Sequence, residues 1–177
     1  FTVLVGCWKS TSKTVEKTTV TEVDKPGTVP KDATATLENK YGKYVHYYDP
    51  SKWTISENTT DFAEFELAHK TGDGYGMFIF ERIQMPLKTL KKSALNNLRR
   101  ADPEAYIVQE SRRTVNGVKV LVLTTAGTVE EIDFVYYGYY AAGKWGTLQA
   151  ITYTGTNLFD EYKNDFTEFL NGLVITD

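Results

Sequence analysis

The sequence contains little cysteine and little histidine. Its 177 residues include one cysteine, Cys7, and two histidines, His46 and His69. One cysteine excludes an intrachain disulfide framework and any multi-cysteine metal site. Two histidines, neither at a metal-ligand spacing, are too few for a His-rich metal centre or a His-based relay. We therefore expect no metal and no cofactor, and we expect both histidines to be packing or surface residues.

The chain also lacks a large excess of charge of one sign. It has 20 Lys and Arg against 23 Asp and Glu, which gives a net charge of −3. A protein that binds nucleic acid by general electrostatic attraction would carry a basic excess. Nucleic acid is therefore not expected as a partner, and the length fits one domain with a modest extension.

Motifs of catalysis are missing as well. There is no G-x-S-x-G motif, and no activating context surrounds Ser56, Ser93 or Ser111. The glycine-rich run over residues 72–76 superficially resembles a phosphate-binding loop, but a predicted strand follows it where such a loop needs a helix. We therefore predict a hairpin turn there, no catalytic residue and no enzyme.

The amino-terminal residues form a short apolar run that ends in the cysteine. The run is too short to span a bilayer, which needs about 20 apolar residues, and it has the size of the end of a signal-peptide core. Leu4-Val5-Gly6-Cys7 resembles the lipobox of bacterial lipoproteins. The resemblance implies that residues 1–6 are a signal-peptide remnant and that Cys7 carries the lipid that anchors the protein to a membrane. The alternative is a buried edge strand with Cys7 in the core.

The next 33 residues have the composition of a tether. Residues 8–40 contain eight Thr, six Lys and five acids but only one aromatic residue. Such a composition buries too little apolar surface to offset chain entropy. We expect residues 7–40 to be a disordered tether that joins the lipid anchor to a single domain over residues 41–177. This arrangement places the domain on the extracytoplasmic side of a bacterial cell envelope.

Hydrophobic periodicity and turn residues predict the elements of that domain. Asn116-Gly117 is the strongest hairpin signal in the chain. Strands are predicted over residues 44–48, 53–56, 62–68, 75–84, 105–115, 118–125, 132–140 and 145–154, with Phe62, Phe65 and Leu67 buried. Helices are predicted from Pro86 to Pro103 and from about residue 156 to Asn171. The fold class is α+β, a twisted antiparallel β-sheet with flanking helices.

The order of these elements, over residues 44–175, resembles the PsbP/Mog1/DcrB-like domains. The resemblance depends on the segment Tyr48–Trp53, the Pro86 helix, the Asn116-Gly117 hairpin and the closing helix around Tyr162–Phe166. It implies a PsbP/Mog1-like fold of the kind found in bacterial lipoproteins and thylakoid lumen proteins. Several of these proteins act in scaffolding or assembly, and they share no catalytic motif to transfer.

The first predicted helix and its approach carry a local basic charge. Between Glu81 and Asp102 there is no acid, and the six basic residues are Arg82, Lys88, Lys91, Lys92, Arg99 and Arg100. We expect Lys88, Lys91, Lys92 and Arg99 to share the face opposite the leucines. This face is either an ordinary solvated surface or a docking surface for a protein partner or an anionic envelope partner such as a polymer or lipid headgroup.

Four tyrosines in the run Tyr136-Tyr137-Gly138-Tyr139-Tyr140 would lie on both faces of the strand predicted over residues 132–140. Tyr137 and Tyr139 are candidate contact residues at a binding surface, since tyrosine is common in recognition sites. The alternative is that these tyrosines only reflect the preference of tyrosine for strands.

Three functions follow from these observations. The leading hypothesis is a non-enzymatic, lipid-anchored envelope protein that binds or scaffolds a partner. The second is a small-ligand carrier, which requires a deep apolar pocket lined by tyrosines. The third is a hydrolytic enzyme, which requires converging carboxylates with raised pKa values in a cleft.

Overall fold

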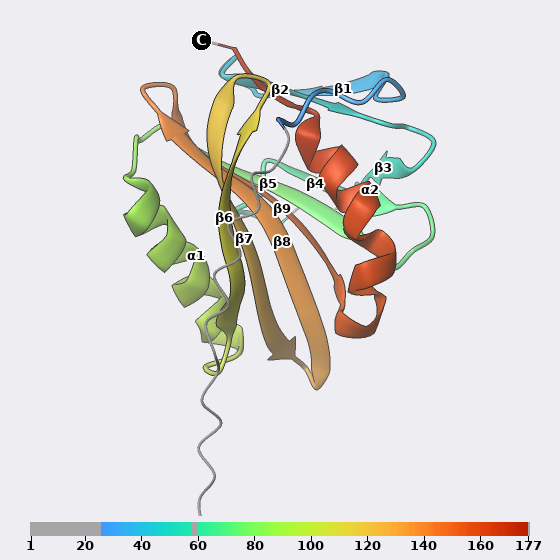
Figure 1. Ribbon diagram of the computed structural model, residues 1–177, viewed down its shortest axis with the longest axis vertical. Coiled ribbons are helices and arrows are strands. Elements are labelled where there is room, and N and C mark those ends of the chain that lie inside the picture. Colours follow the sequence, from blue (N-terminus) through green and yellow to red (C-terminus); the bar gives the residue numbers. More distant parts are fainter. Residues whose placement is uncertain (1–25, 58–59, 177) are drawn as a thin grey trace, which may run out of the picture.

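A computed structural model gives the arrangement of residues 26–57 and 60–176 (Figure 1). The predicted lipobox, Cys7 and most of the predicted tether lie outside these described residues. None of the helices in the described part of the chain is both long enough and apolar enough to cross a membrane.

A seven-stranded antiparallel sheet forms the centre of the domain, in the order β3-β4-β5-β9-β8-β7-β6. Its strands are β3 (Trp53–Ile55), β4 (Phe65–His69), β5 (Tyr75–Glu81), β6 (Tyr106–Val115), β7 (Val118–Val129), β8 (Ile132–Gly143) and β9 (Gly146–Gly155). The strands from β6 to β9 follow one another through hairpins, and β5 then pairs with β9. The expected antiparallel sheet is therefore confirmed.

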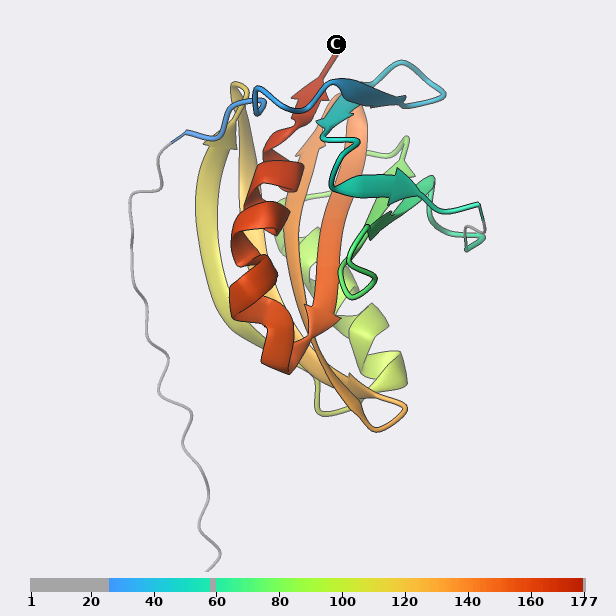
Figure 2. The ribbon, with the colours of Figure 1, turned by 90° about the vertical axis from the view of Figure 1, so that its right-hand side faces the viewer.

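A second, smaller antiparallel sheet lies at one end of the domain (Figures 1 and 2). It consists of β1 (Ala35–Glu38), β2 (Tyr44–Tyr48) and β10 (Leu173–Ile175), with β2 in the middle. The sequence predicted β2 but neither of its neighbours, because both are too short to show a period of their own.

The folded part of the chain begins earlier than the sequence predicted. β1 lies inside the predicted tether, and Leu37 in this strand is buried in the main core. The N–H of Gly27 donates to the carbonyl of Thr114 at 2.8 Å, and the carbonyl of Gly27 accepts from the N–H of Asn116 at 2.9 Å. The tether prediction is thus wrong from Gly27 onward. The polar composition averaged over residues 8–40 did not indicate β1, although every residue of this strand pairs with β2.

Two helices lie on opposite faces of the large sheet (Figures 1 and 2). They are α1 (Leu87–Ala101) and α2 (Phe159–Asn171), and a 3-10 turn, η1 (Thr156–Leu158), leads into α2. α1 packs on β7 and β8, and α2 packs on β8 and β9. Both helices are amphipathic, as predicted, because their apolar residues recur every three or four positions.

The central strands are buried on both faces because each face has its own helix. In β7, Val120 and Val122 point into the main core beneath α2, whereas Leu121 and Leu123 point into a smaller cluster beneath α1. The smaller cluster contains one fully buried residue of α1, Leu90. α1 is therefore held to the sheet by much less apolar surface than α2.

Two hairpin turns occur where the sequence predicted them. Asn116 and Gly117 both have positive φ angles, +46° and +84°, as a two-residue hairpin turn requires. The glycine-rich run forms the β4–β5 turn, where the N–H of His69 donates to the carbonyl of Gly74 at 2.7 Å.

One burial prediction is wrong. Phe62 is exposed and not buried, because it lies in the loop before β4.

Candidate functional site

The outward side of α1 presents basic side chains. Lys88, Lys92 and Arg99 are four and seven residues apart, so they lie along one side of the helix, and all three are exposed. Leu90 faces the opposite way, into the sheet. The structure thus places three of the four predicted basic residues together on a solvent-facing surface, which we call the α1 basic face.

Lys91, the fourth predicted residue, belongs to a different environment. Its ammonium group is paired with the carboxylate of Glu110 on β6. It lies between the leucine side and the α1 basic face, and it is only partly exposed. Lys91 therefore contributes to the attachment of α1 to the edge of the sheet.

Tyr137 and Tyr139 are buried, so the prediction that they form a contact surface is wrong. The hydroxyl of Tyr139 accepts a hydrogen bond from Arg113 Nη1 at 2.7 Å and donates one to Asn171 Oδ1 at 3.1 Å. Burial raises the pKa of Tyr139. Both rings belong to the main core because α2 covers this face of β8.

Other aromatic residues, on the α1 side of the sheet, remain partly exposed. These residues, which we call the aromatic row, are Phe134 and Tyr136 on β8, Tyr153 on β9 and Tyr75 on β5. The ring centres of Tyr75 and Tyr153 are 5.2 Å apart, and those of Tyr136 and Tyr153 are 5.5 Å apart. The rings are adjacent because these residues are direct cross-strand partners.

The aromatic row lies on the same side of the domain as α1. Tyr136 is four residues from Tyr140, so both point to one face of β8, and Tyr140 packs under α1. The carboxyl-terminal end of α1 is attached to β7 nearby, because Oδ2 of Asp102, which follows the last residue of the helix, accepts a hydrogen bond from the N–H of Thr128 at 2.8 Å. The row and the α1 basic face therefore lie on the same side of the domain, and we consider them together as one candidate surface. The sequence predicted tyrosines on both faces of β8, including Tyr136, but it could not show which of the two faces α2 covers.

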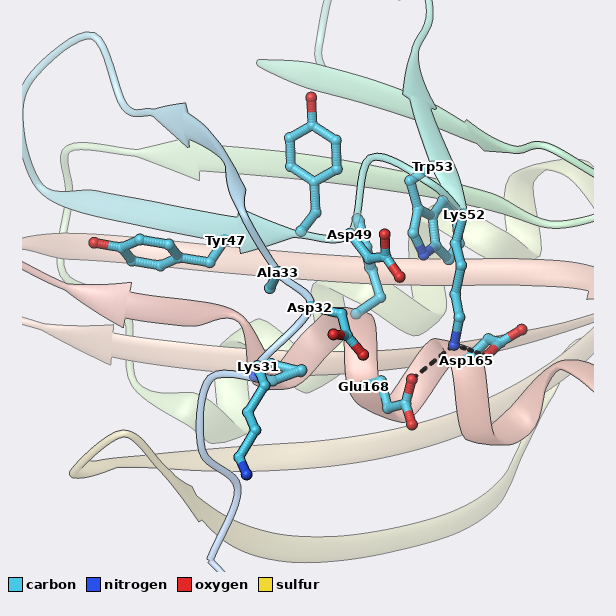
Figure 3. Close-up of a pocket in the computed structure, with 12 residues that line it drawn as sticks. Lys31, Asp32, Ala33, Tyr47, Asp49, Lys52, Trp53, Asp165 and Glu168 are labelled. Carbon is cyan, nitrogen blue, oxygen red and sulfur yellow. Dashed lines mark hydrogen bonds and ion pairs between the residues drawn. The ribbon is translucent and has the colours of Figure 1, made fainter.

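A shallow pocket lies on the other side, between β2, the start of β3 and α2 (Figure 3). Its volume is about 190 Å³, whereas pockets for small molecules usually enclose about 300–1,000 Å³. Lys52 Nζ reaches across it to Asp165 Oδ1 at 2.7 Å and Glu168 Oε2 at 2.9 Å. Hydrogen bonds to these two carboxylates raise the pKa of Lys52. The pocket is small and charged, unlike the deep apolar cavity that the carrier hypothesis requires.

The pocket also differs from the cleft that the enzyme hypothesis requires. The hydrogen bond from Ser51 lowers the pKa of the Asp49 carboxyl, which is opposite to the raised value of a general acid. In the ranges that the structure describes, no three His, Cys, Asp or Glu side chains are grouped so that they could hold a metal ion.

Both histidines are packing residues, which is one of the two roles that the sequence predicted for them. His46 is buried between Phe78 and Phe169, with ring centres 4.5 Å and 4.6 Å away. Burial lowers its pKa to about 3, so it is neutral. His69 is also buried, and its Nδ1 lies 2.7 Å from Thr71 Oγ1.

Comparison with known proteins gives similarity in structure only. No protein-family model matches this sequence, and no curated protein matches it. The cyanobacterial PsbP protein CyanoP from Synechocystis sp. PCC 6803 has a TM-score of 0.61 at 11% identity, covering 87% of this chain and 99% of CyanoP. The Ran-binding protein Mog1p of Saccharomyces cerevisiae has a TM-score of 0.57 at 8% identity, covering 81% of this chain and 95% of Mog1p.

A third similar structure is LpqN of Mycobacterium tuberculosis, which is described as involved in cell envelope biogenesis. Its TM-score is 0.55 at 12% identity, and the match covers 81% of this chain and 90% of LpqN. Identities this low show the fold and not the function. The chain therefore has the α+β fold of PsbP and Mog1, as the order of its predicted elements indicated.

Proposed function

We propose that this chain is a non-enzymatic binding module of the bacterial cell envelope, anchored by a lipid on Cys7 on the extracytoplasmic side. Its partner is an acidic protein or an anionic envelope polymer, and the α1 side of the sheet is the contact surface. The lipobox-like residues Leu4-Val5-Gly6-Cys7 support the anchor. The likeness in fold to an envelope biogenesis protein is compatible with this role.

The observation that carries the proposal is the charge of α1. The helix contains no acid, and its exposed side presents Lys88, Lys92 and Arg99, although the chain as a whole has a net charge of −3. A local basic surface on an acidic chain attracts acidic partners and orients them as they approach. Lys88 and Lys92 are exposed and add nothing to packing, whereas Arg99 is exposed but its Nε also donates a hydrogen bond to the carbonyl of Ala105 at 2.8 Å.

The aromatic row adds the second part of the contact surface. Partly exposed tyrosine rings provide rigid apolar area with a polar end, and such residues contribute strongly to binding energy when a partner buries them. Tyr75, Tyr136 and Tyr153 are already held in contact with one another. Binding would therefore cost little side-chain entropy.

The first experiment tests the anchor. The chain is expressed in a bacterial host behind the basic n-region of a host lipoprotein signal peptide, and its intact mass is measured after extraction with detergent. We expect a product that begins at Cys7 and carries acyl chains, and we expect Cys7→Ser to move the protein to the aqueous phase. An unmodified product that retains Phe1 contradicts the proposed anchor.

The second experiment tests the contact surface with poly-L-glutamate as an acidic probe, measured by fluorescence anisotropy. The basic-face variant combines Lys88→Ser, Lys92→Ser and Arg99→Ser. We expect it to bind about tenfold more weakly or worse, because each base near an anionic surface adds about 1 kcal/mol.

The matched control variant removes the same charge elsewhere. It combines Lys70→Ser, Lys119→Ser and Lys163→Ser, which are three exposed lysines outside α1. We expect the control to bind the probe as the parent does. Equal losses in the two variants would show that net charge alone decides binding and would contradict the proposed surface.

A further inference from the structure

Three segments that are far apart in the sequence bring aromatic rings together at one end of the domain. Tyr41 lies in the β1–β2 turn, Phe80 near the end of β5, and Trp145 in the β8–β9 turn. The ring centres of Tyr41 and Phe80 are 6.1 Å apart, and those of Phe80 and Trp145 are 6.5 Å apart and nearly parallel. We call this group, with the neighbouring Ile83, the aromatic tip.

Basic side chains surround the aromatic tip. Lys40 Nζ and Arg82 Cζ each lie 5.1 Å from the centre of the Tyr41 ring. Lys144 is exposed beside Trp145 in the β8–β9 turn. These contacts combine cations with aromatic faces in the manner of cation–π pairs.

Three acids, Glu38, Glu64 and Glu81, lie close to the same end, and they offset most of this charge. The Glu64 carboxylate accepts hydrogen bonds from Asn39 Nδ2 and from the Tyr44 hydroxyl, each at 2.8 Å, so internal donors satisfy it. Glu81 is exposed at the end of β5, and Glu38 is exposed at the end of β1. The four bases of these segments, Lys40, Lys43, Arg82 and Lys144, exceed the three acids by one, so the tip keeps a small net positive charge.

The tip exposes apolar surface that packing does not explain. Ile83 is 72% exposed and Tyr41 is 45% exposed. The backbone around Ile83 is nevertheless fixed, because its carbonyl accepts a hydrogen bond from Thr147 Oγ1 at 2.6 Å. The isoleucine side chain is thus held outward by an ordered loop, where folding gains no free energy from burying it.

The turn that carries Trp145 is built tightly against β5. Gly146 has a φ of +134°, and a Cβ at this position would lie 2.4 Å from the carbonyl oxygen of Glu81. Only glycine allows the two segments to approach so closely. Figure 1 shows the β8–β9 turn next to the loop that leads into α1. The aromatic tip is therefore a rigid surface formed before any partner binds.

We propose that the aromatic tip inserts into the interfacial region of a bilayer that contains anionic phospholipid. Aromatic rings with polar ends favour the membrane interface, and an exposed isoleucine gains free energy when it enters the acyl boundary. Lys40, Arg82 and Lys144 would meet the lipid phosphates while their stems cover apolar surface. This contact is separate from the lipid on Cys7, and it would fix the orientation of the domain on the membrane.

The test uses the full chain with Cys7→Ser, so that no attached lipid contributes to binding, and with Trp8→Phe. Two tryptophans then remain, and Trp53 is only 2% exposed. Trp145 is therefore the fluorophore that reports on the tip. Vesicles of phosphatidylglycerol and phosphatidylcholine, with or without brominated acyl chains, are compared with vesicles of phosphatidylcholine alone.

We expect the Trp145 emission to shift to the blue, and brominated lipid to quench it, only when phosphatidylglycerol is present. The variant Tyr41→Ser with Ile83→Ser should bind at least about tenfold more weakly, because it loses two apolar insertions. The matched control is Tyr106→Ser with Val108→Ser, which lie on β6 and are 51% and 55% exposed. We expect the control to bind as the parent does.

Two results would overturn the proposal. The first is vesicle binding without quenching of Trp145, which would show that another part of the chain contacts the lipid. The second is binding that the tip variant retains but that the basic-face variant of α1 loses, which would make the α1 basic face the lipid-binding surface. Neither result bears on the poly-L-glutamate experiment, so the two proposals fail independently.

Discussion

The imidazole of His46 lies edge-on against the ring of Phe169, with the ring centres 4.6 Å apart. Among the described residues, neither ring nitrogen of His46 has a hydrogen-bond partner. A charged imidazolium at this position would be buried without compensation, and this burial lowers the pKa of His46 to about 3. The contact is therefore stable only while His46 is neutral.

This burial predicts how stability depends on pH. The unfolded chain binds a proton on His46 near pH 6.5, whereas the folded chain does so near pH 3. The free energy of unfolding should therefore fall as the pH drops below about 6.5, by up to about 1.4 kcal/mol per pH unit. Between pH 7 and pH 5 the parent should lose about 2 kcal/mol more than His46→Phe, measured by urea unfolding. Equal losses in the two proteins would contradict the assignment, because their carboxylates are the same.

The largest apolar contact between α1 and the sheet is made by one side chain, Leu90. Leu90 is the fully buried residue of this helix, so Leu90→Ala should lower the free energy of unfolding by about 2–4 kcal/mol. Amide hydrogen exchange should also speed up in α1 before it does in β9, because α1 has its own small cluster. Thr89→Ala, at an exposed position of the same helix, is the control and should change little. Equal acceleration of amide exchange in α1 and β9 would show that the helix does not unfold separately from the sheet.

Gly172 allows the end of α2 to approach β2 closely. A Cβ at this position would lie 1.8 Å from the carbonyl oxygen of Tyr47, and the N–H of Tyr47 donates to the Gly172 carbonyl at 2.9 Å. We expect Gly172→Ala to lower the free energy of unfolding by at least about 2 kcal/mol in chemical denaturation. At Gly155 a Cβ would meet only the end of the Asn157 side chain, so Gly155→Ala should cost much less. Similar costs for both variants would contradict the close approach of backbones.

The local signals in the sequence predicted most of the large sheet and both helices. Asn116-Gly117 forms the expected turn, and the leucine spacing of α1 places Leu90 against the sheet. These features depend on residues that are neighbours in the chain. Local patterns were therefore enough to indicate the fold class and the order of the elements.

The parts that the sequence missed are short strands or depend on distant packing. β1 pairs with its neighbour β2 in a local hairpin, and β10 adds to the other edge of β2 from far along the chain, but neither strand is long enough to show its period. The burial of Tyr137 follows from the position of α2, which no residue of β8 indicates. The aromatic tip joins Tyr41, Phe80 and Trp145 across about a hundred positions of the sequence, so no local pattern could reveal it.

Site-specific photo-crosslinking in the envelope of living cells tests the proposed contact surface most directly. A photoreactive residue replaces Asn96, which is exposed on α1 one turn from Lys92 and Arg99, or Asn164, which is exposed on α2. We predict a discrete adduct from position 96 that the basic-face variant abolishes and the matched lysine control retains, and no such adduct from position 164. An adduct of equal yield from both helices, or one that survives removal of the α1 charges, would contradict the account.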